Sequence, residues 1–163
     1  MRFARFIPFI IVGLLISVGA RSAAFREVAI QVGEAAGPVE QRVARLLQER
    51  LAEPGLAPVR LASSVSSTPD TLTILLGRPE HHAALRDLMD AENIAPLTPL
   101  APGAEGFLLQ LLPMSPGGTL LAAGIDDRGC LYAAGEILRQ ATFQDGRICM
   151  PDNLRVRTAP AFE

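Results

Sequence analysis

Two apolar segments in the last third of the chain restrict its fold more than any other feature. Residues 104–112 and 119–125 are rich in leucine and alanine, and the Pro/Gly-rich residues 113–118 separate them. This pattern predicts two strands joined as a hairpin. Leu109 and Leu111 fall on one face of the first strand, whereas Leu108 and Leu112 fall on the other. A strand with one wet face should alternate instead. We therefore expect a central hairpin covered by this chain's helices on one side and by a neighbouring domain on the other.

Helical periodicity predicts three helices beside this hairpin. The first begins at Pro38 and ends before Pro54, the second begins at Arg78, and the third covers about residues 127–142. The first helix should bury Val39, Val43, Leu46, Leu47 and Leu51 and expose Glu40, Gln41, Arg45, Gln48 and Glu49. The second should bury Leu85, Leu88 and Met89, and the third Leu131, Ala134, Ile137, Leu138 and Ala141, with Ala133 and Gly135 allowing close approach to the sheet.

Four further strands complete the expected fold. They cover residues 27–32, 58–62 and 71–76, with a last edge strand at 143–150 that turns at Asp145 and Gly146. Residues 63–69 and 93–103 are expected to be loops, because they are polar or proline-rich and lack periodicity. Strands joined by a hairpin, with helices between other strands, favour an α+β fold. We expect a mixed, mostly antiparallel sheet of about five strands with helices packed on one face.

The N-terminus resembles a secretory signal peptide. Arg2 and Arg5 precede the uncharged apolar residues 6–18, and small residues follow at 18–20 and again at 22–24. Cleavage is expected after Ala20, with Ala24 as the second candidate, and the protein is then exported to the periplasm or the extracellular space without a stable membrane anchor. The alternative is an uncleaved anchor, but a spanning helix needs about 20 apolar residues, and this run is shorter and meets Arg21.

Composition limits the classes of partner. The apolar fraction of 49% and the charged fraction of 20% are typical of a globular domain. The net charge is −2 and becomes more negative when Arg2 and Arg5 are removed. The arginines are scattered, so nucleic acid, which is bound by clustered cations, is not an expected partner. Cys130 and Cys149 are the two cysteines. They could pair in an exported protein, or each could be a small buried side chain.

Four segments of the chain are similar to a known family. They are residues 74–79, 105–107, 124–138 and 157–162, read as a strand-to-helix turn, the start of a hairpin, a strand with its following helix, and a lead-in to a barrel. In order and spacing they resemble the N-terminal accessory domain that precedes the catalytic barrel of bacterial β-N-acetylhexosaminidases and α-glucuronidases. The chain departs from that pattern at Cys130, where the family often has an aliphatic residue, and at Ala133, where it often has glycine.

The resemblance implies a domain organisation and a function. Residues 27–153 would be the accessory domain and residues 154–163 a linker into a catalytic barrel that is absent from this chain. The domain would be non-catalytic and would brace that barrel, in cis or in trans, in an exported hydrolase of polysaccharides or glycoconjugates bearing hexosamine or glucuronic acid. The alternative is a free-standing exported module that binds a carbohydrate or a protein. A glycan is a less favoured partner, because the chain has no Trp and one Tyr, Tyr132.

No residue pattern in the chain specifies a complete active site. Asp126 and Asp127 are a carboxylate pair, but at a helix start they are expected to cap the helix and to interact favourably with its dipole. Glycosidases need two carboxyl groups that flank the scissile bond, usually on a barrel of about 250 residues. An autonomous small enzyme is therefore disfavoured, and we assign no catalytic residue.

The remaining candidates also favour structural roles. Glu80, His81 and His82 lack the one-turn spacing of helical zinc ligands and are expected on an exposed first helical turn. Arg128 and Gly129 are expected to tie a helix start to a loop rather than to bind an anion. Residues 63–68 are rich in hydroxyl groups but contain no nucleophile elbow, and Cys130 is expected to pack. We therefore assign no cofactor-binding or metal-ligating residue and expect no cofactor.

Overall fold

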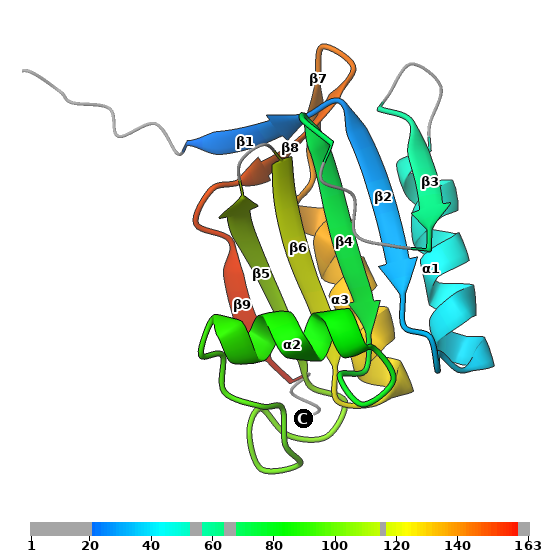
Figure 1. Ribbon diagram of the computed structural model, residues 1–163, viewed down its shortest axis with the longest axis vertical. Helices are drawn as coiled ribbons and strands as arrows, with labels where there is room; N and C mark the ends of the chain where they lie inside the picture. The colour runs from blue at the N-terminus through cyan, green and yellow to red at the C-terminus, as the bar shows by residue number, and fades with distance from the viewer. Residues whose placement is uncertain (1–20, 53–56, 64–67, 115–116, 160–163) are drawn as a thin grey trace, which may run out of the picture.

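The computed structural model of the chain describes residues 21–52, 57–63, 68–114 and 117–159 (Figure 1). Its centre is a six-stranded sheet with the strand order β3-β2-β4-β6-β5-β9. The bounds are β2 Glu27–Val32, β3 Val59–Ala62, β4 Thr71–Gly77, β5 Phe107–Met114, β6 Gly117–Gly124 and β9 Arg155–Thr158. The first four strands of that order are parallel, whereas β5 is antiparallel to both β6 and β9.

A second, smaller sheet lies at one end of the main sheet. It has the order β1-β8-β7 and is antiparallel throughout, with β1 Ser22–Phe25, β7 Thr142–Gln144 and β8 Arg147–Pro151. Over both sheets, the described residues make four antiparallel pairings and three parallel ones. The expected fold class, an α+β fold with a mixed and mostly antiparallel arrangement of strands, is confirmed.

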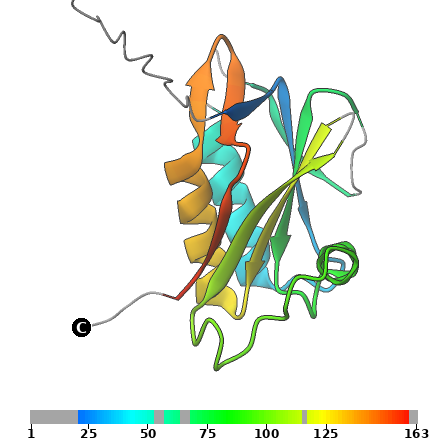
Figure 2. The ribbon, with the colours of Figure 1, turned by 90° about the vertical axis from the view of Figure 1, so that its left-hand side faces the viewer.

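The three helices of the described residues lie on two faces of the main sheet. α1 (Pro38–Leu51) and α3 (Asp127–Gln140) pack side by side on one face, and α2 (Ala83–Ala91) crosses the other face near the ends of β4, β5 and β6 (Figures 1 and 2). The expected packing on one face therefore holds for α1 and α3. With helices on both sides of the sheet, every residue of β4 is buried, as in central parallel strands. None of the helices in the described part of the chain is long and apolar enough to cross a membrane.

Our expectation that a neighbouring domain covers the second face of the hairpin is wrong. Leu108 is 1% exposed and Leu112 is 7% exposed in this chain alone. Both belong to an apolar cluster with Leu85 and Met89 of α2 and with Ile94 just after it. The short helix and the segment that follows it therefore close this face, which periodicity within the strands could not reveal.

Several element boundaries also differ from the expectations. Residues 155–158, expected within a linker, form edge strand β9 and pair with β5. The expected edge strand at 143–150 is a hairpin of β7 and β8, which turns at Asp145 and Gly146 as predicted but belongs to the small sheet. The third strand of that sheet, β1, pairs with β8 from Ser22 to Phe25 and was not expected.

Candidate functional site

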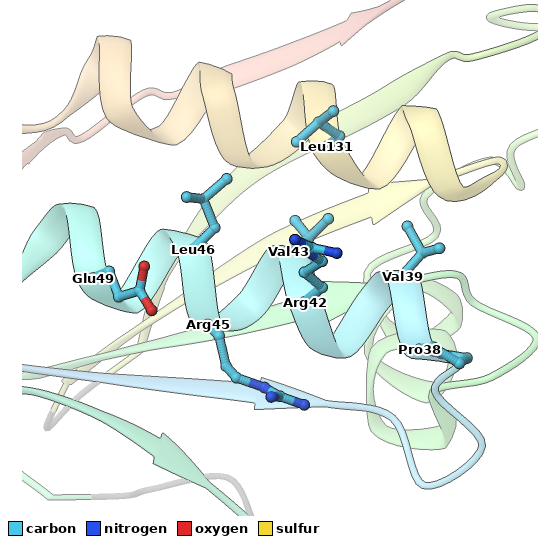
Figure 3. A pocket seen from close by; sticks show the side chains of 8 residues that line it. All are labelled: Pro38, Val39, Arg42, Val43, Arg45, Leu46, Glu49 and Leu131. Atoms are coloured by element: carbon cyan, nitrogen blue, oxygen red, sulfur yellow. The ribbon is translucent and has the colours of Figure 1, made fainter.

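An apolar groove lies between α1 and α3 on their outer surface, away from the sheet. Its volume is about 790 Å³. Val39 and Leu46 of α1 and Leu131 of α3 are 44%, 40% and 45% exposed, and Figure 3 shows the three side chains facing the space between the two helices. Leu138, about two turns after Leu131 on α3 and beyond the residues that line the groove, is also exposed. Large apolar side chains that gather in one place on a surface are typical of an interaction site.

These four residues were expected to be buried against the sheet, and the structure corrects that prediction. Of the five α1 residues expected in the core, only Val43, Leu47 and Leu51 are buried there, together with Ala44. On α3, the buried residues include Cys130, Ala133 and Ala134, whose small side chains let the helix approach the sheet. That orientation turns Leu131 and Leu138 outward. Each helix therefore carries more apolar surface than its own sheet uses. Gly135 is exposed and, contrary to expectation, does not contact the sheet.

Charged side chains border the groove. Arg42, Arg45 and Glu49 of α1 line it together with the apolar residues (Figure 3). An apolar centre with a charged border is the usual composition of a protein–protein interface. The same arrangement suits a glycan less well, because sugar rings are stacked on aromatic side chains and no aromatic residue lines this groove among the residues that the structure describes.

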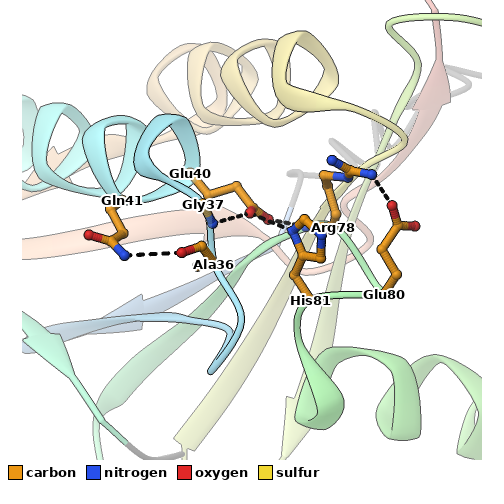
Figure 4. Close-up of polar contacts among 7 residues, drawn as sticks. All are labelled: Ala36, Gly37, Glu40, Gln41, Arg78, Glu80 and His81. Atoms are coloured by element: carbon orange, nitrogen blue, oxygen red, sulfur yellow. Dashed lines mark hydrogen bonds and ion pairs between the residues drawn. The ribbon is translucent and has the colours of Figure 1, made fainter.

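A buried carboxylate fixes the start of α1. The Glu40 side chain is 1% exposed and accepts hydrogen bonds from the backbone N–H groups of Gly37 and Arg78, both at 2.8 Å. Arg78 donates to Oε1, whereas Gly37 donates to Oε2, and Nδ1 of His81 lies 2.7 Å from that same Oε2 (Figure 4). Burial raises the pKa of Glu40, but the hydrogen bonds from Arg78, His81 and Gly37 together outweigh it and lower the pKa below its ordinary value.

The position of Glu40 explains its role. It joins the loop between β2 and α1 to the segment between β4 and α2, where parallel strands end side by side. Arg78 also forms an ion pair with Glu80, and Gln41 donates a hydrogen bond to the carbonyl of Ala36 at 3.0 Å (Figure 4). Both oxygens of Glu40 are engaged, so this carboxylate acts as a tie that orients α1 and the groove it carries.

The structure confirms helix capping at Asp126. Its Oδ1 accepts a hydrogen bond from the N–H of Gly129 at 2.8 Å, and its Oδ2 accepts one from the N–H of Glu105 at 3.0 Å. Asp127 is the first residue of α3, where a negative charge interacts favourably with the helix dipole. The two carboxylates thus have the structural positions expected for them.

The histidine pair has a different environment from the one expected. α2 begins at Ala83, so Glu80 and His81 precede the helix rather than forming its first turn. His82 is fully buried as the N-cap and accepts a hydrogen bond from the N–H of Leu85 at 3.4 Å. Burial lowers the pKa of His82. Among the described residues, no group of three or more His, Cys, Asp or Glu side chains is placed to hold a metal ion.

Arg128 and Gly129 have the tying role predicted for them. Arg128 forms an ion pair with Glu105, whose carboxylate also accepts a hydrogen bond from the Tyr132 hydroxyl at 3.4 Å. A Cβ atom at Gly129 would collide with the carbonyl oxygen of Gly106. The first turn of α3 is therefore held tightly against the segment that leads into β5.

Both cysteines are buried and unpaired. Cys130 lies in the first turn of α3. Cys149 lies on β8, opposite Thr142 of β7, just beyond the other end of that helix. The length of the helix, about 20 Å at 1.5 Å per residue, separates them, so a disulfide between them cannot form in this fold. Burial raises the pKa of the Cys130 thiol to about 12, which fits the packing role expected for it. Most of the hydroxyl-rich segment at 63–68 lies outside the described residues.

Two residues important to this architecture were not identified from the sequence. Glu40 was placed on the exposed face of α1, although a glutamate three residues after a helix N-cap commonly turns back to the N-cap backbone. Arg157 was placed in a linker, whereas its guanidinium donates hydrogen bonds to three backbone carbonyls of the segment after α2. Nothing in the local pattern around Arg157 indicates those partners.

Comparison with known proteins leaves the family open. No protein-family model matches the chain, and no curated protein matches it. A solved structure described as "Structure of CpGH84D" is similar at a TM-score of 0.47 and 12% sequence identity, over 80% of this chain and 21% of that chain. The present chain thus spans about a fifth of that protein's length. At this score and identity, the likeness carries no inference about function.

Proposed function

We propose that this chain is a non-catalytic accessory domain of an exported glycoside hydrolase and that it braces a catalytic barrel through the groove between α1 and α3. The observation that carries the proposal is the set of exposed apolar side chains on these two helices: Val39, Leu46, Leu131 and Leu138. Replacing these residues by alanine or by a charged residue should weaken the binding of a partner more than it lowers the stability of the domain. The reason is that the sheet does not use them for its own core.

The sequence resemblance supports the identity of the partner. Three of its segments meet at one end of the main sheet. Residues 74–79 include the end of β4, residues 105–107 lead into β5, and residues 124–138 join β6 to α3. The glycines in these segments allow close packing, as at Gly124, where a Cβ atom would collide with the backbone of Cys130. The resemblance therefore rests on residues that shape the fold, which is what an accessory domain shares with its relatives.

The carboxylates at this end of the sheet support a non-catalytic role. Glu40 is saturated by three donors, Asp126 caps a helix, and Glu105 is paired with Arg128. Glycoside hydrolysis needs one carboxyl group to transfer a proton and a second to act as nucleophile or base. Each of these side chains is instead committed to a local structural contact. By resemblance alone, the substrate of the whole enzyme would be a polysaccharide or glycoconjugate containing hexosamine or glucuronic acid.

Export is part of the proposal. The segment that resembles a signal peptide, residues 1–20, lies outside the described residues, and β1 begins at Ser22. Cleavage after Ala20 would leave β1 whole, whereas cleavage after Ala24 would remove three of its four residues. The pairing of β1 with β8 therefore favours Ala20 as the site. We place the mature domain in the periplasm or outside the cell.

The test first asks whether a catalytic barrel is encoded beside this chain and then measures its binding. The transcript is first sequenced on both sides of the codons for residues 1–163, and any barrel with paired acidic residues in the same or a neighbouring frame is expressed separately. Isothermal titration then compares the wild-type domain with the double variant Leu46→Asp, Leu131→Asp. We expect the double variant to lose at least about tenfold in affinity, because charged groups would be buried in an apolar contact.

Leu100→Asp serves as the matched control, because Leu100 is exposed on a different part of the surface. It should bind like the wild type. If no barrel is encoded beside this chain, or if the double variant binds as tightly as the wild type, the proposal is wrong. Binding of an unrelated protein or a glycan by the isolated domain would instead favour a free-standing module.

A further inference from the structure

A second cavity opens where β4 and β6 end. These neighbouring strands are parallel, but the chain leaves β4 toward α2 on one face of the sheet and leaves β6 toward α3 on the other (Figure 2). The two connections therefore diverge at the carboxyl ends of the strands. In open sheets with parallel strands, ligands bind in the crevice that such a divergence creates.

The cavity has an apolar interior. Its volume is about 430 Å³, within the usual range for small-molecule sites. Six apolar residues line it: Pro79, Met89, Ile94, Pro96, Leu97 and Ile125. Met89 and Ile94 are buried in the core cluster beneath α2, so they form the floor. The site is lined by side chains that the fold already holds in place.

Arg157 holds one wall of this cavity. Its Nη1 donates a hydrogen bond to the carbonyl of Ala95 at 2.7 Å, and its Nη2 donates to the carbonyls of Pro96 and Ala101 at 2.8 and 3.1 Å. Hydrogen bonds from a charged donor are among the stronger ones in proteins. They fix the segment that contains Pro96 and Leu97 against edge strand β9, so the cavity exists before any ligand enters and little ordering is needed on binding.

Three charged side chains surround the opening, and one of them has no counter-ion among the described residues. Glu80 is paired with Arg78, and Arg86 is paired with Asp87, whose Oδ1 lies 3.7 Å from the Nε of Arg86. Asp90 also lines the cavity and is exposed, and its carboxylate makes no ion pair within the part of the chain that the structure describes. Once these two ion pairs are taken into account, the carboxylate of Asp90 remains as one uncompensated negative charge above an apolar floor.

We propose that this cavity binds a small amine with an apolar body, the ammonium group at Asp90 and the apolar part over Met89 and Ile94. The site is separate from the groove between α1 and α3 and does not depend on the function proposed above. The charge of Asp90 favours an amine over an anionic ligand of the same shape, and the apolar floor distinguishes the site from a general surface for cations.

The test uses cyclohexylmethylamine as the probe and NMR of the mature chain labelled on its methionine and isoleucine methyl groups. Cyclohexylmethanol and cyclohexanecarboxylate have nearly the same shape without the positive charge. We expect the amine to shift the methyl signals of Met89 and Ile94, with a dissociation constant of about 1 mM or tighter. The methyl group of Met150, in the small sheet, should not shift.

Two variants separate the contribution of the Asp90 charge to binding from that of the apolar cavity. Asp90→Asn should weaken binding of the amine by about two- to fivefold, as expected for an exposed ion pair, and should not change binding of the alcohol. Glu92→Gln removes the same charge from an exposed residue that does not line the cavity and should bind like the wild type. Intermolecular NOEs from the cyclohexyl ring to the Met89 methyl group locate the probe without any variant.

Three results would overturn the proposal. They are no methyl shifts at millimolar amine, shifts and NOEs confined to another surface, and equal affinity for the amine and the carboxylate.

Discussion

The carboxylate of Glu40 and Nδ1 of His81 lie 2.7 Å apart, although 41 positions separate the two residues in the sequence. Their contact joins the first turn of α1 to the segment that leads into α2. It is completed by the backbone N–H groups of Gly37 and Arg78, which donate to the same carboxylate. Because two sequence-distant connections meet on one buried side chain, their relative position depends on it.

Replacing Glu40 should therefore destabilise the domain. Glu40→Gln keeps the size of the side chain but loses the charge, and its amide group can accept only through one oxygen. We expect the free energy of unfolding to fall by about 1–3 kcal/mol, because a buried donor is left unsatisfied. Urea denaturation measures the change. Glu49→Gln, on the exposed face of the same helix, is the control and should change it by less than about 0.5 kcal/mol. Equal effects of the two substitutions would contradict the role of Glu40.

The stability should also depend on pH through Glu40. Its pKa is lower in the folded chain than its ordinary value of 4.5, so the folded state binds the proton more weakly than the unfolded state does. The stabilisation from the charged carboxylate is therefore complete above the ordinary pKa and is lost as the pH falls through the lowered pKa. The difference in unfolding free energy between the wild type and Glu40→Gln should shrink as the pH is lowered below 4.5. A difference that stays constant would show that Glu40 does not titrate as described.

Two adjacent leucines of α1 should differ sharply when substituted. Leu47 is 1% exposed and packs on the sheet, whereas Leu46 is 40% exposed in the groove. Leu47→Ala should reduce the free energy of unfolding by about 2–5 kcal/mol, because it leaves a cavity in the core. Leu46→Ala should reduce it by less than about 1 kcal/mol. Thermal or urea unfolding of the two variants makes the comparison, and similar losses would mean that Leu46 serves the core and not an interface.

The sequence predicted the centre of the fold well, because the information is local there. The hairpin of β5 and β6 and the cap at Asp126 follow from apolar runs, turn residues and a short polar side chain at a helix start. Each of these features is set by residues within a few positions of one another.

The sequence predicted the packing of the helices less well. Periodicity gives the direction of an apolar stripe but not how much of it the sheet covers, so Leu46 and Leu131 were expected in the core. The carboxylate of Glu40 was missed because Arg78 and His81 approach it only in the folded chain. α2 was not recognised as the cover over Leu108 and Leu112 because it, too, approaches them only in the folded chain.

The proposed cleavage of a signal segment can be tested on the purified protein. Ser22 to Phe25 pair with β8, and the carbonyl of Arg21 accepts a hydrogen bond from Asp152 N–H at 3.1 Å. We expect an exported protein that begins at Arg21, since cleavage after Ala24 would remove most of β1. Intact-mass measurement and N-terminal sequencing of the secreted protein distinguish the two. A mature chain that begins at Phe25, or one that retains Met1, would contradict the expectation.

Arg157 should control the order of the segment after α2. Arg157→Ala removes all three hydrogen bonds to the carbonyls of Ala95, Pro96 and Ala101, and these carbonyls then rely on water. Amide hydrogen exchange in residues 95–104 should become at least about tenfold faster. In the variant, local opening of this segment costs less free energy because it no longer has to break the three hydrogen bonds. The free energy of global unfolding should fall by about 1–2 kcal/mol. Arg155→Ala is the matched control, since Arg155 lies two residues earlier on the same strand and is exposed. If Arg155→Ala accelerates exchange as much as Arg157→Ala, the acceleration reflects a weakened β9 and not the loss of the guanidinium contacts.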